Sequence, residues 1–190
     1  TPYFLSNSGG ITLQAGSGAH TLAANVILGA NQTWGNVSSN AFTVTGSISG
    51  PNSLTLVGAY RFYNPGVYSP SNNTVYATYT TVATDYVGNG TIVLSGNNTY
   101  RGGTTVSSAT LVVSGQSGTN SGTGTGPLIV QAGGTLSGNG RLAGALTVAN
   151  ASNALLYPNI RGGGVLRLGS SLSFSGSASG INFNLSSRTA

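Results

Sequence analysis

Charged side chains are nearly absent from this chain of 190 residues. It contains six Arg, one acidic residue (Asp85) and no Lys or Glu, so that charged residues make up 4% of the sequence, against about 25% in a typical globular domain. A single carboxylate excludes chemistry that needs two of them and carboxylate cages for Ca²⁺ or Mg²⁺. The lack of Lys and Glu also argues against coiled coils and helical bundles, whose surfaces depend on strong helix formers.

The chain also has no Cys, which excludes a disulfide framework and thiolate chemistry. No apolar stretch approaches the roughly 18 residues that a membrane-spanning helix needs, so we expect no membrane span. We also expect no cofactor and no metal site, because the residues that would hold them are missing.

Small polar residues and glycine dominate what is present. Gly, Ser, Thr and Asn occur 31, 26, 23 and 19 times and form just over half of the chain, while 38% of the residues are hydrophobic. The hydrophobic residues fall in runs of three to five, each bounded by Gly, Asn or Ser, for example Leu54–Val57, Thr91–Leu94 and Thr110–Val113. Such runs are typical of short β-strands, and no segment keeps a helical period. The sequence therefore predicts an all-β fold.

Internal repetition separates a solenoid from a sandwich or closed barrel. A unit of Gly-Gly or Asn-Gly, then Thr with apolar residues, then Ser-Gly occurs at 89–96 and at 132–138, with an echo at 9–13. One such unit cannot bury its apolar face alone, but stacked units bury a continuous core. With about 20–25 residues in each rung, we expect roughly eight rungs at a spacing of ~4.8 Å. We also expect the abundant Asn residues to stack on one another between rungs.

Two stretches carry a resemblance to a known family. Residues 89–113, which begin Asn-Gly-Thr-Ile-Val-Leu-Ser-Gly-Asn-Asn-Thr-Tyr-Arg-Gly-Gly, and residues 124–148 resemble the autotransporter-associated β-strand repeat. The segment with Asn31-Gln-Thr-Trp34 is similar to the part that precedes such a repeat. The resemblance implies a right-handed parallel β-helix, exported to the bacterial surface or secreted, without catalytic residues. We take 1–190 as a single solenoid domain.

Residues 59–88 interrupt the repeat and hold seven of the fifteen aromatic residues, six of them tyrosines. Tyrosine supplies contact area at low entropic cost and is enriched at interfaces. Three readings stay open for this predicted loop or hairpin between rungs. It folds back over the rod and buries its own rings, it contacts another protein, or it stacks on a glycan.

Candidate reactive and charged residues are few. His20, Asp85 and a serine could compose a triad only in principle, because the sequence has no nucleophile-elbow motif. The net charge is +5, but no basic cluster of the kind that binds nucleic acid occurs. Four arginines follow one another at intervals of 40, 40 and 20 residues and would lie on one side of a regular solenoid, where they could hold an acidic surface polysaccharide: Arg61, Arg101, Arg141 and Arg161.

The two ends of the sequence carry apolar runs where a solenoid needs polar caps. We therefore expect a non-enzymatic, exported structural subunit that associates head to tail with copies of itself, or exchanges a strand with them, into a surface or extracellular fibre. The alternative is a monomeric adhesin or glycan-binding passenger module. The predicted subunit contacts are Tyr3, Phe4, Leu5, Tyr60, Phe62, Tyr63, Tyr68, Tyr76, Tyr79, Ile181, Phe183 and Leu185.

Overall fold

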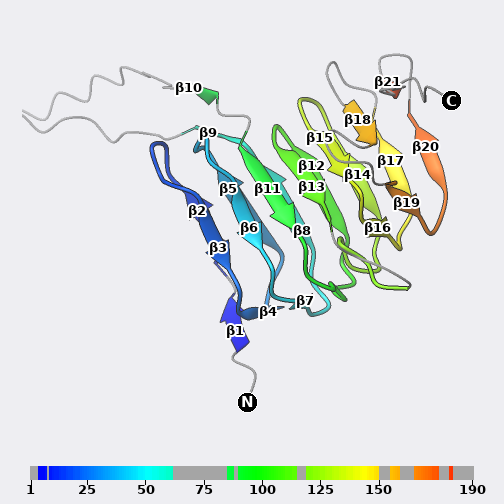
Figure 1. Ribbon diagram of the computed structural model, residues 1–190, viewed down its shortest axis with the longest axis horizontal. Helices are drawn as coiled ribbons and strands as arrows, with labels where there is room; N and C mark the ends of the chain where they lie inside the picture. The colour runs from blue at the N-terminus through cyan, green and yellow to red at the C-terminus, as the bar shows by residue number, and fades with distance from the viewer. Residues whose placement is uncertain are drawn as a thin grey trace, which may run out of the picture.

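The protein is a stack of short parallel strands. The computed structural model describes residues 4–7, 9–61, 85–87, 90–114, 119–149, 155–158, 165–175 and 180–181, and every regular element within these ranges is a β-strand. Figure 1 shows the strands as successive layers along one long axis. The all-β parallel β-helix predicted from the sequence is confirmed. Its right-handed winding stays a prediction, although parallel crossover connections have that hand in almost all proteins.

The strands form three faces, and the chain visits them in the same order in each turn. Face 1 comprises a three-stranded and a two-stranded sheet, made of β1 (Phe4–Asn7), β4 (Asn25–Leu28), β7 (Ile48–Ser49), β16 (Arg141–Leu142) and β19 (Arg167–Leu168). Face 2 is a seven-stranded sheet of β2 (Thr12–Leu13), β5 (Gln32–Asn36), β8 (Leu54–Val57), β12 (Thr104–Ser107), β14 (Leu128–Val130), β17 (Leu146–Val148) and β20 (Leu172–Phe174). Face 3 is a seven-stranded sheet of β3 (His20–Leu22), β6 (Phe42–Val44), β11 (Thr91–Leu94), β13 (Thr110–Val113), β15 (Thr135–Gly138), β18 (Leu155–Pro158) and β21 (Gly180–Ile181).

Backbone hydrogen bonds join the two parts of face 1 where no strand is assigned. Asn98 N donates to Ser121 O at 2.8 Å, and Gly122 N donates to Arg141 O at 2.8 Å. On the other side, Thr99 N donates to Ile48 O at 2.8 Å. Face 1 therefore continues from β7 through residues 98–101 and 121–122 to β16, and the described residues form seven rungs.

The number of rungs is smaller than the eight or so expected because one turn is much longer than the others. Side chains that bond from one rung to the next commonly join residues 22 to 24 positions apart, as between Asn25 and Ser47 or between Asn98 and Gly122. Across the segment predicted to be an insertion, the corresponding bond from Ile48 to Asn98 spans 50 positions. The strands on both sides nevertheless stay in register, with Phe42 beside Ile92.

The long turn leaves the rod through a two-stranded antiparallel ladder of β9 (Ala59–Arg61) and β10 (Asp85–Val87). In this ladder Tyr60 lies opposite Tyr86, and Arg61 lies opposite Asp85. Residues 62–84 and 88–89 lie outside the described residues, so the predicted aromatic loop between the two strands stays a prediction. The assignment of 1–190 to one domain likewise stays a prediction.

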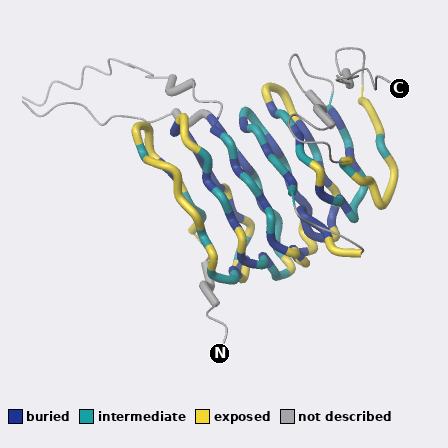
Figure 2. The backbone as a smooth tube through the Cα atoms, viewed as in Figure 1, coloured by how far each residue is buried: buried dark blue, intermediate teal, exposed yellow. Residues whose placement is uncertain are grey.

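Alternation along each strand builds the core. In β11 and β13 the residues alternate between half-buried and buried, and the buried ones are apolar. Parallel register places each inward residue on its equivalent in the next rung, for example Ile92 on Leu111 and Leu111 on Leu136. Trp34 and Phe42 fill one end of this core with their ring centroids 6.2 Å apart. Figure 2 shows the resulting buried positions repeating along the stack.

Asparagine does bond between rungs, but in the described contacts its partners are backbone groups rather than other asparagines. Asn25 Oδ1 accepts a hydrogen bond from Ser47 N at 2.9 Å, and Asn31 Oδ1 accepts one from Ser53 N at 2.9 Å. These side chains satisfy backbone groups at the corners, where no strand partner is available. These asparagines therefore bond to the backbone of the next rung, and the expected stacking of Asn on Asn stays a prediction.

Candidate association surfaces of the β-helix

The rung made of β19, β20 and β21 exposes apolar side chains. Val165 is 64% exposed, Leu168 38% and Phe174 39%, and Leu166 and Leu172 are only partly buried. Exposed apolar side chains that stand singly are ordinary on protein surfaces, but a contiguous group of them marks an interaction surface. We call Leu168, Leu172 and Phe174 the end-rung set.

The exposure of the end-rung set follows from its position in the stack rather than from the direction of its side chains. Leu168 is the register partner of Leu142, and Phe174 is the register partner of Val148. Leu142 and Val148 are both 0% exposed, because another rung covers each of them. The exposed residues thus occupy core positions that have a neighbouring rung on one side only within the described stack.

The rung at the other end, made of β1, β2 and β3, is better covered. Leu13 is buried, and Ile11 and Leu22 pack partly buried against the core. Of the predicted contacts at this end, Phe4 and Leu5 lie in β1 and pair with Asn25 and Val26.

The other predicted subunit contacts are placed only in part. Ile181 lies in β21, beside Leu156 of β18, and Tyr60 lies in β9 at the base of the long turn. The remaining predicted contacts fall outside the described residues, namely Tyr3, Phe62, Tyr63, Tyr68, Tyr76, Tyr79, Phe183 and Leu185. The contact role of all these residues stays a prediction.

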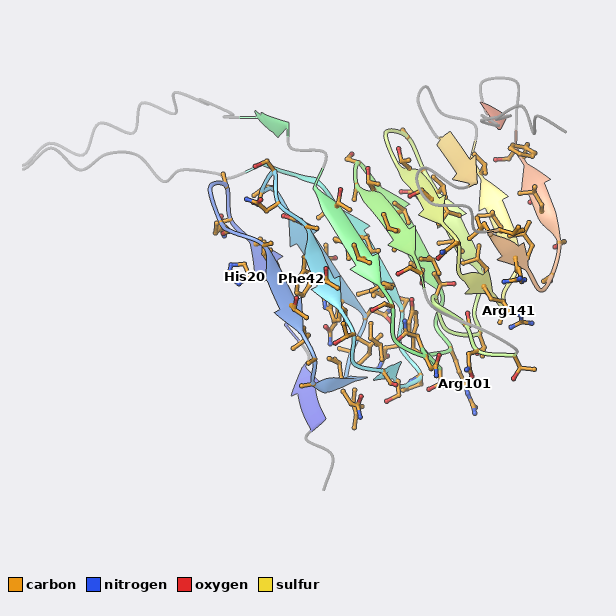
Figure 3. The ribbon with its side chains drawn as sticks, in the orientation of Figure 1. His20, Phe42, Arg101 and Arg141 are labelled. Carbon is orange, nitrogen blue, oxygen red and sulfur yellow. The ribbon has the colours of Figure 1, made fainter. Side chains whose placement is uncertain are left out.

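The predicted arginine stripe is also placed in part. Arg101 is exposed at the corner that follows face 1, beside an open hollow of about 350 Å³ that Gly50, Pro51 and Thr99 also line. Arg141 lies in β16, and Figure 3 shows both arginines along the lower side of the rod. Arg61 lies in β9, and Arg161 lies outside the described residues. The register of β16 pairs Arg141 with Arg167, which the sequence analysis did not select.

No catalytic arrangement emerges from the residues weighed for a triad. His20 is exposed in β3, in register with Phe42, and Asp85 lies in β10, which pairs only with β9. Figure 3 shows His20 on the outside of the stack. The described residues contain no group of three His, Cys, Asp or Glu that could hold a metal ion. They also contain no helix that is long and apolar enough to cross a membrane.

Two buried polar clusters hold the middle rungs together. Asn98 Oδ1 accepts from Ile48 N at 2.8 Å, and Asn98 Nδ2 donates to Gly122 O at 2.6 Å. The hydroxyl of Tyr100 hydrogen-bonds Thr104 Oγ1 in the core. Burial raises the pKa of the Tyr100 hydroxyl well above its usual value, and the bond to Thr104 lowers it by less. These side chains stabilise the stacked rungs, because their hydrogen-bond partners are backbone groups or each other.

Sequence reasoning missed the end-rung set, Arg167 and Asn98. For the first two the sequence holds only a weak signal: the similar runs Leu146-Thr-Val148 and Leu172-Ser-Phe174 lie 26 positions apart, and the same interval separates Arg141 from Arg167. Asn98 is one of 19 asparagines, and nothing in its local sequence distinguishes a buried amide from an exposed one.

Comparison with known proteins supports the family resemblance over one segment. Residues 87–113 match the family model of the passenger-associated-transport-repeat. This segment begins at the last residue of β10, contains β11, Asn98 and β12, and ends with β13, so it covers more than one turn of the helix. No curated protein and no solved structure shows significant similarity to the chain. The match and the parallel β-helix suggest a structural part of an exported passenger, at the cell surface or outside the cell, rather than a catalytic one. Residues 87–113 of this β-helix are similar to a repeat that is associated with passenger transport.

Proposed function

We propose that this chain is a non-catalytic structural module of an exported protein and that its rods associate end to end, copy upon copy, into a surface or extracellular fibre. The observation that carries the proposal is the end-rung set, whose core positions are covered in every inner rung and open in this one. The partner that fits this end is another rung of the same shape, because the exposed end of the stack has the same surface that each inner rung presents to its neighbour. A second copy can supply that rung from its β1–β3 end.

Strand geometry favours such an association. The outer edges of β19, β20 and β21 have no strand partner among the described residues, and free strand edges template pairing with another chain. Proteins commonly guard such edges with charged residues, above all Lys, whereas β20 and β21 contain no charged residue. A head-to-tail contact of this kind does not close into a ring when the rods stay coaxial, so it propagates. A strand exchanged between copies at the same end would give the same polymer.

The test is sedimentation velocity over a wide range of concentration with two matched variants. Leu168→Ser removes an end-rung side chain that is 38% exposed, and Ile27→Ser removes an equally exposed apolar side chain from the outer side of β4, within face 1. We expect the wild type and Ile27→Ser to form larger species as the concentration rises, and Leu168→Ser to remain monomeric.

A wild-type chain that sediments as a monomer at every concentration would contradict the proposal. Equal effects of Leu168→Ser and Ile27→Ser on the association would contradict it as well, since the association would then be nonspecific contact between exposed apolar side chains. If the wild-type chain is a monomer at every concentration, the alternative function is a passenger module that binds a glycan as a single rod.

A further inference from the structure

Two arginines face each other across neighbouring rungs of face 1. Arg141 of β16 and Arg167 of β19 are register partners in a parallel pair, which sets their backbones about 4.8 Å apart. Like charges placed directly opposite each other destabilise a sheet unless something neutralises them. The pair therefore needs an explanation beyond the packing of the rod.

The Arg141 guanidinium is fixed in position by the rungs on both sides of it. Its Nη1 donates a hydrogen bond to Thr119 O at 2.8 Å. Its Nη2 lies over Gly169, where a methyl group in place of the glycine hydrogen would approach to 2.5 Å. The guanidinium thus extends along the rod towards the rung that carries Arg167, and only part of its donor capacity is used.

Arg167 has no partner of its own among the described residues. Its side chain is exposed, and the described contacts contain no hydrogen bond or ion pair from it. The only acidic residue of the sequence, Asp85, lies in the β9–β10 ladder, which pairs with no strand of face 1. An anion from outside this part of the chain is therefore needed to neutralise the positive charge of the two arginines.

We propose that Arg141 and Arg167 form a binding site for the oxyanions, carboxylate or sulfate, of an acidic polysaccharide. Guanidinium groups bind oxyanions with two parallel hydrogen bonds, and neighbouring rungs carry the two arginines at one register position. A pair of cations in otherwise uncharged surroundings suits a polymer with spaced charges. Nucleic acid is a poorer fit, because its dense phosphates are bound by many cations at once. The choice of a polysaccharide rests on the proposed export of the chain, whereas the site itself rests on the two arginines.

The site is tested by binding to immobilised polygalacturonate and heparin, with dextran as the uncharged probe and single-stranded polythymidine as the nucleic-acid probe. Arg167→Gln is the decisive variant, because the side chain is exposed and makes no described hydrogen bond, so its replacement should leave the fold intact. Arg61→Gln removes the same charge from β9, outside face 1, and is the control that distinguishes this pair from the arginine stripe expected from the sequence. We expect Arg167→Gln to weaken binding to the acidic polysaccharides about tenfold and to reduce the slope of log affinity against log salt by about one. Arg61→Gln should leave both unchanged.

Equal losses in Arg167→Gln and Arg61→Gln would overturn the proposal, as would binding of polythymidine that exceeds binding of both polysaccharides at the same salt. Repeating the series in the Leu168→Ser background separates this site from end-to-end association. A loss caused by Arg167→Gln in that background supports the site even if the rods never polymerise.

Discussion

Replacing Asn98 by Ala tests how the β-helix keeps face 1 continuous where it has no assigned strand. The Asn98 side chain is 3% exposed and bonds Ile48 N in the rung before it and Gly122 O in the rung after it. Alanine would leave one buried donor and one buried acceptor without a partner. Each unsatisfied group costs about 1–3 kcal/mol, so we expect the free energy of unfolding to fall by about 2–6 kcal/mol.

The adjacent Asn97 supplies the control, because it is exposed and has the same side chain. Urea unfolding of Asn98→Ala and Asn97→Ala gives the two free energies, and hydrogen exchange gives a local readout. The amide of Ile48 should exchange much faster in Asn98→Ala than in the wild type, since it loses its acceptor. If Asn98→Ala unfolds within about 0.5 kcal/mol of Asn97→Ala, the range of ordinary surface substitutions, the reasoning about this amide is refuted.

Two further predictions concern a packed corner and a buried phenol. Gly96→Ala would place a methyl group 2.2 Å from Gly46 O in the neighbouring rung, whereas Gly18 has open space around it. We expect urea unfolding to show that Gly96→Ala lowers the free energy of unfolding by about 1–3 kcal/mol and that Gly18→Ala lowers it far less. Equal losses in the two variants would contradict this. Burial raises the pKa of Tyr100 above its usual value near 10, so the folded state favours the protonated phenol. The contribution of Tyr100 to the free energy of unfolding should therefore be fully present below about pH 10 and decrease as the pH rises further. Tyr100→Phe should remove part of that fall in urea titrations between pH 8 and pH 11, and an unchanged slope would show that Tyr100 does not ionise on unfolding.

The fold was predictable because the same local pattern recurs along the chain. Short alternating runs such as Thr91–Leu94 and Thr110–Val113 define strands with one buried side. Their separation by Gly, Asn and Ser turns leaves no length for helical crossovers, so stacking is the arrangement that buries every run. The segment similar to the passenger-associated-transport-repeat contains three strands with this alternation, β11, β12 and β13.

The surfaces were less predictable because rung length varies. Leu128 and Leu146 are register partners 18 positions apart, whereas Leu146 and Leu172 are 26 apart. A fixed interval between arginines therefore cannot place them on one line, and the pairing of Arg141 with Arg167 depends on the lengths of the turns between them. The exposure of Phe174 has a similar origin, because its local sequence matches that of inner strands and only its place in the stack differs.

Cysteine cross-linking tests the central claim of end-to-end association most directly, because the chain has no Cys of its own. Ser175, which follows β20, and Thr12 of β2 are exposed residues at opposite ends of face 2, and both occupy the register position that joins Gly35, Val57 and Ser107. Coaxial stacking of two copies would bring their backbones about 4.8 Å apart, within the range that a disulfide spans. Within the chain, Thr147 and Ser173 already meet in this way, with their hydroxyl oxygens 3.1 Å apart.

The chain carrying Thr12→Cys and Ser175→Cys is oxidised and compared with a control carrying Thr105→Cys and Ser175→Cys, in which the first cysteine lies in β12 in the middle of the same face. The account predicts a ladder of disulfide-linked oligomers for the first protein and not for the control. Monomers alone in the first protein, or equal ladders in both, would contradict it.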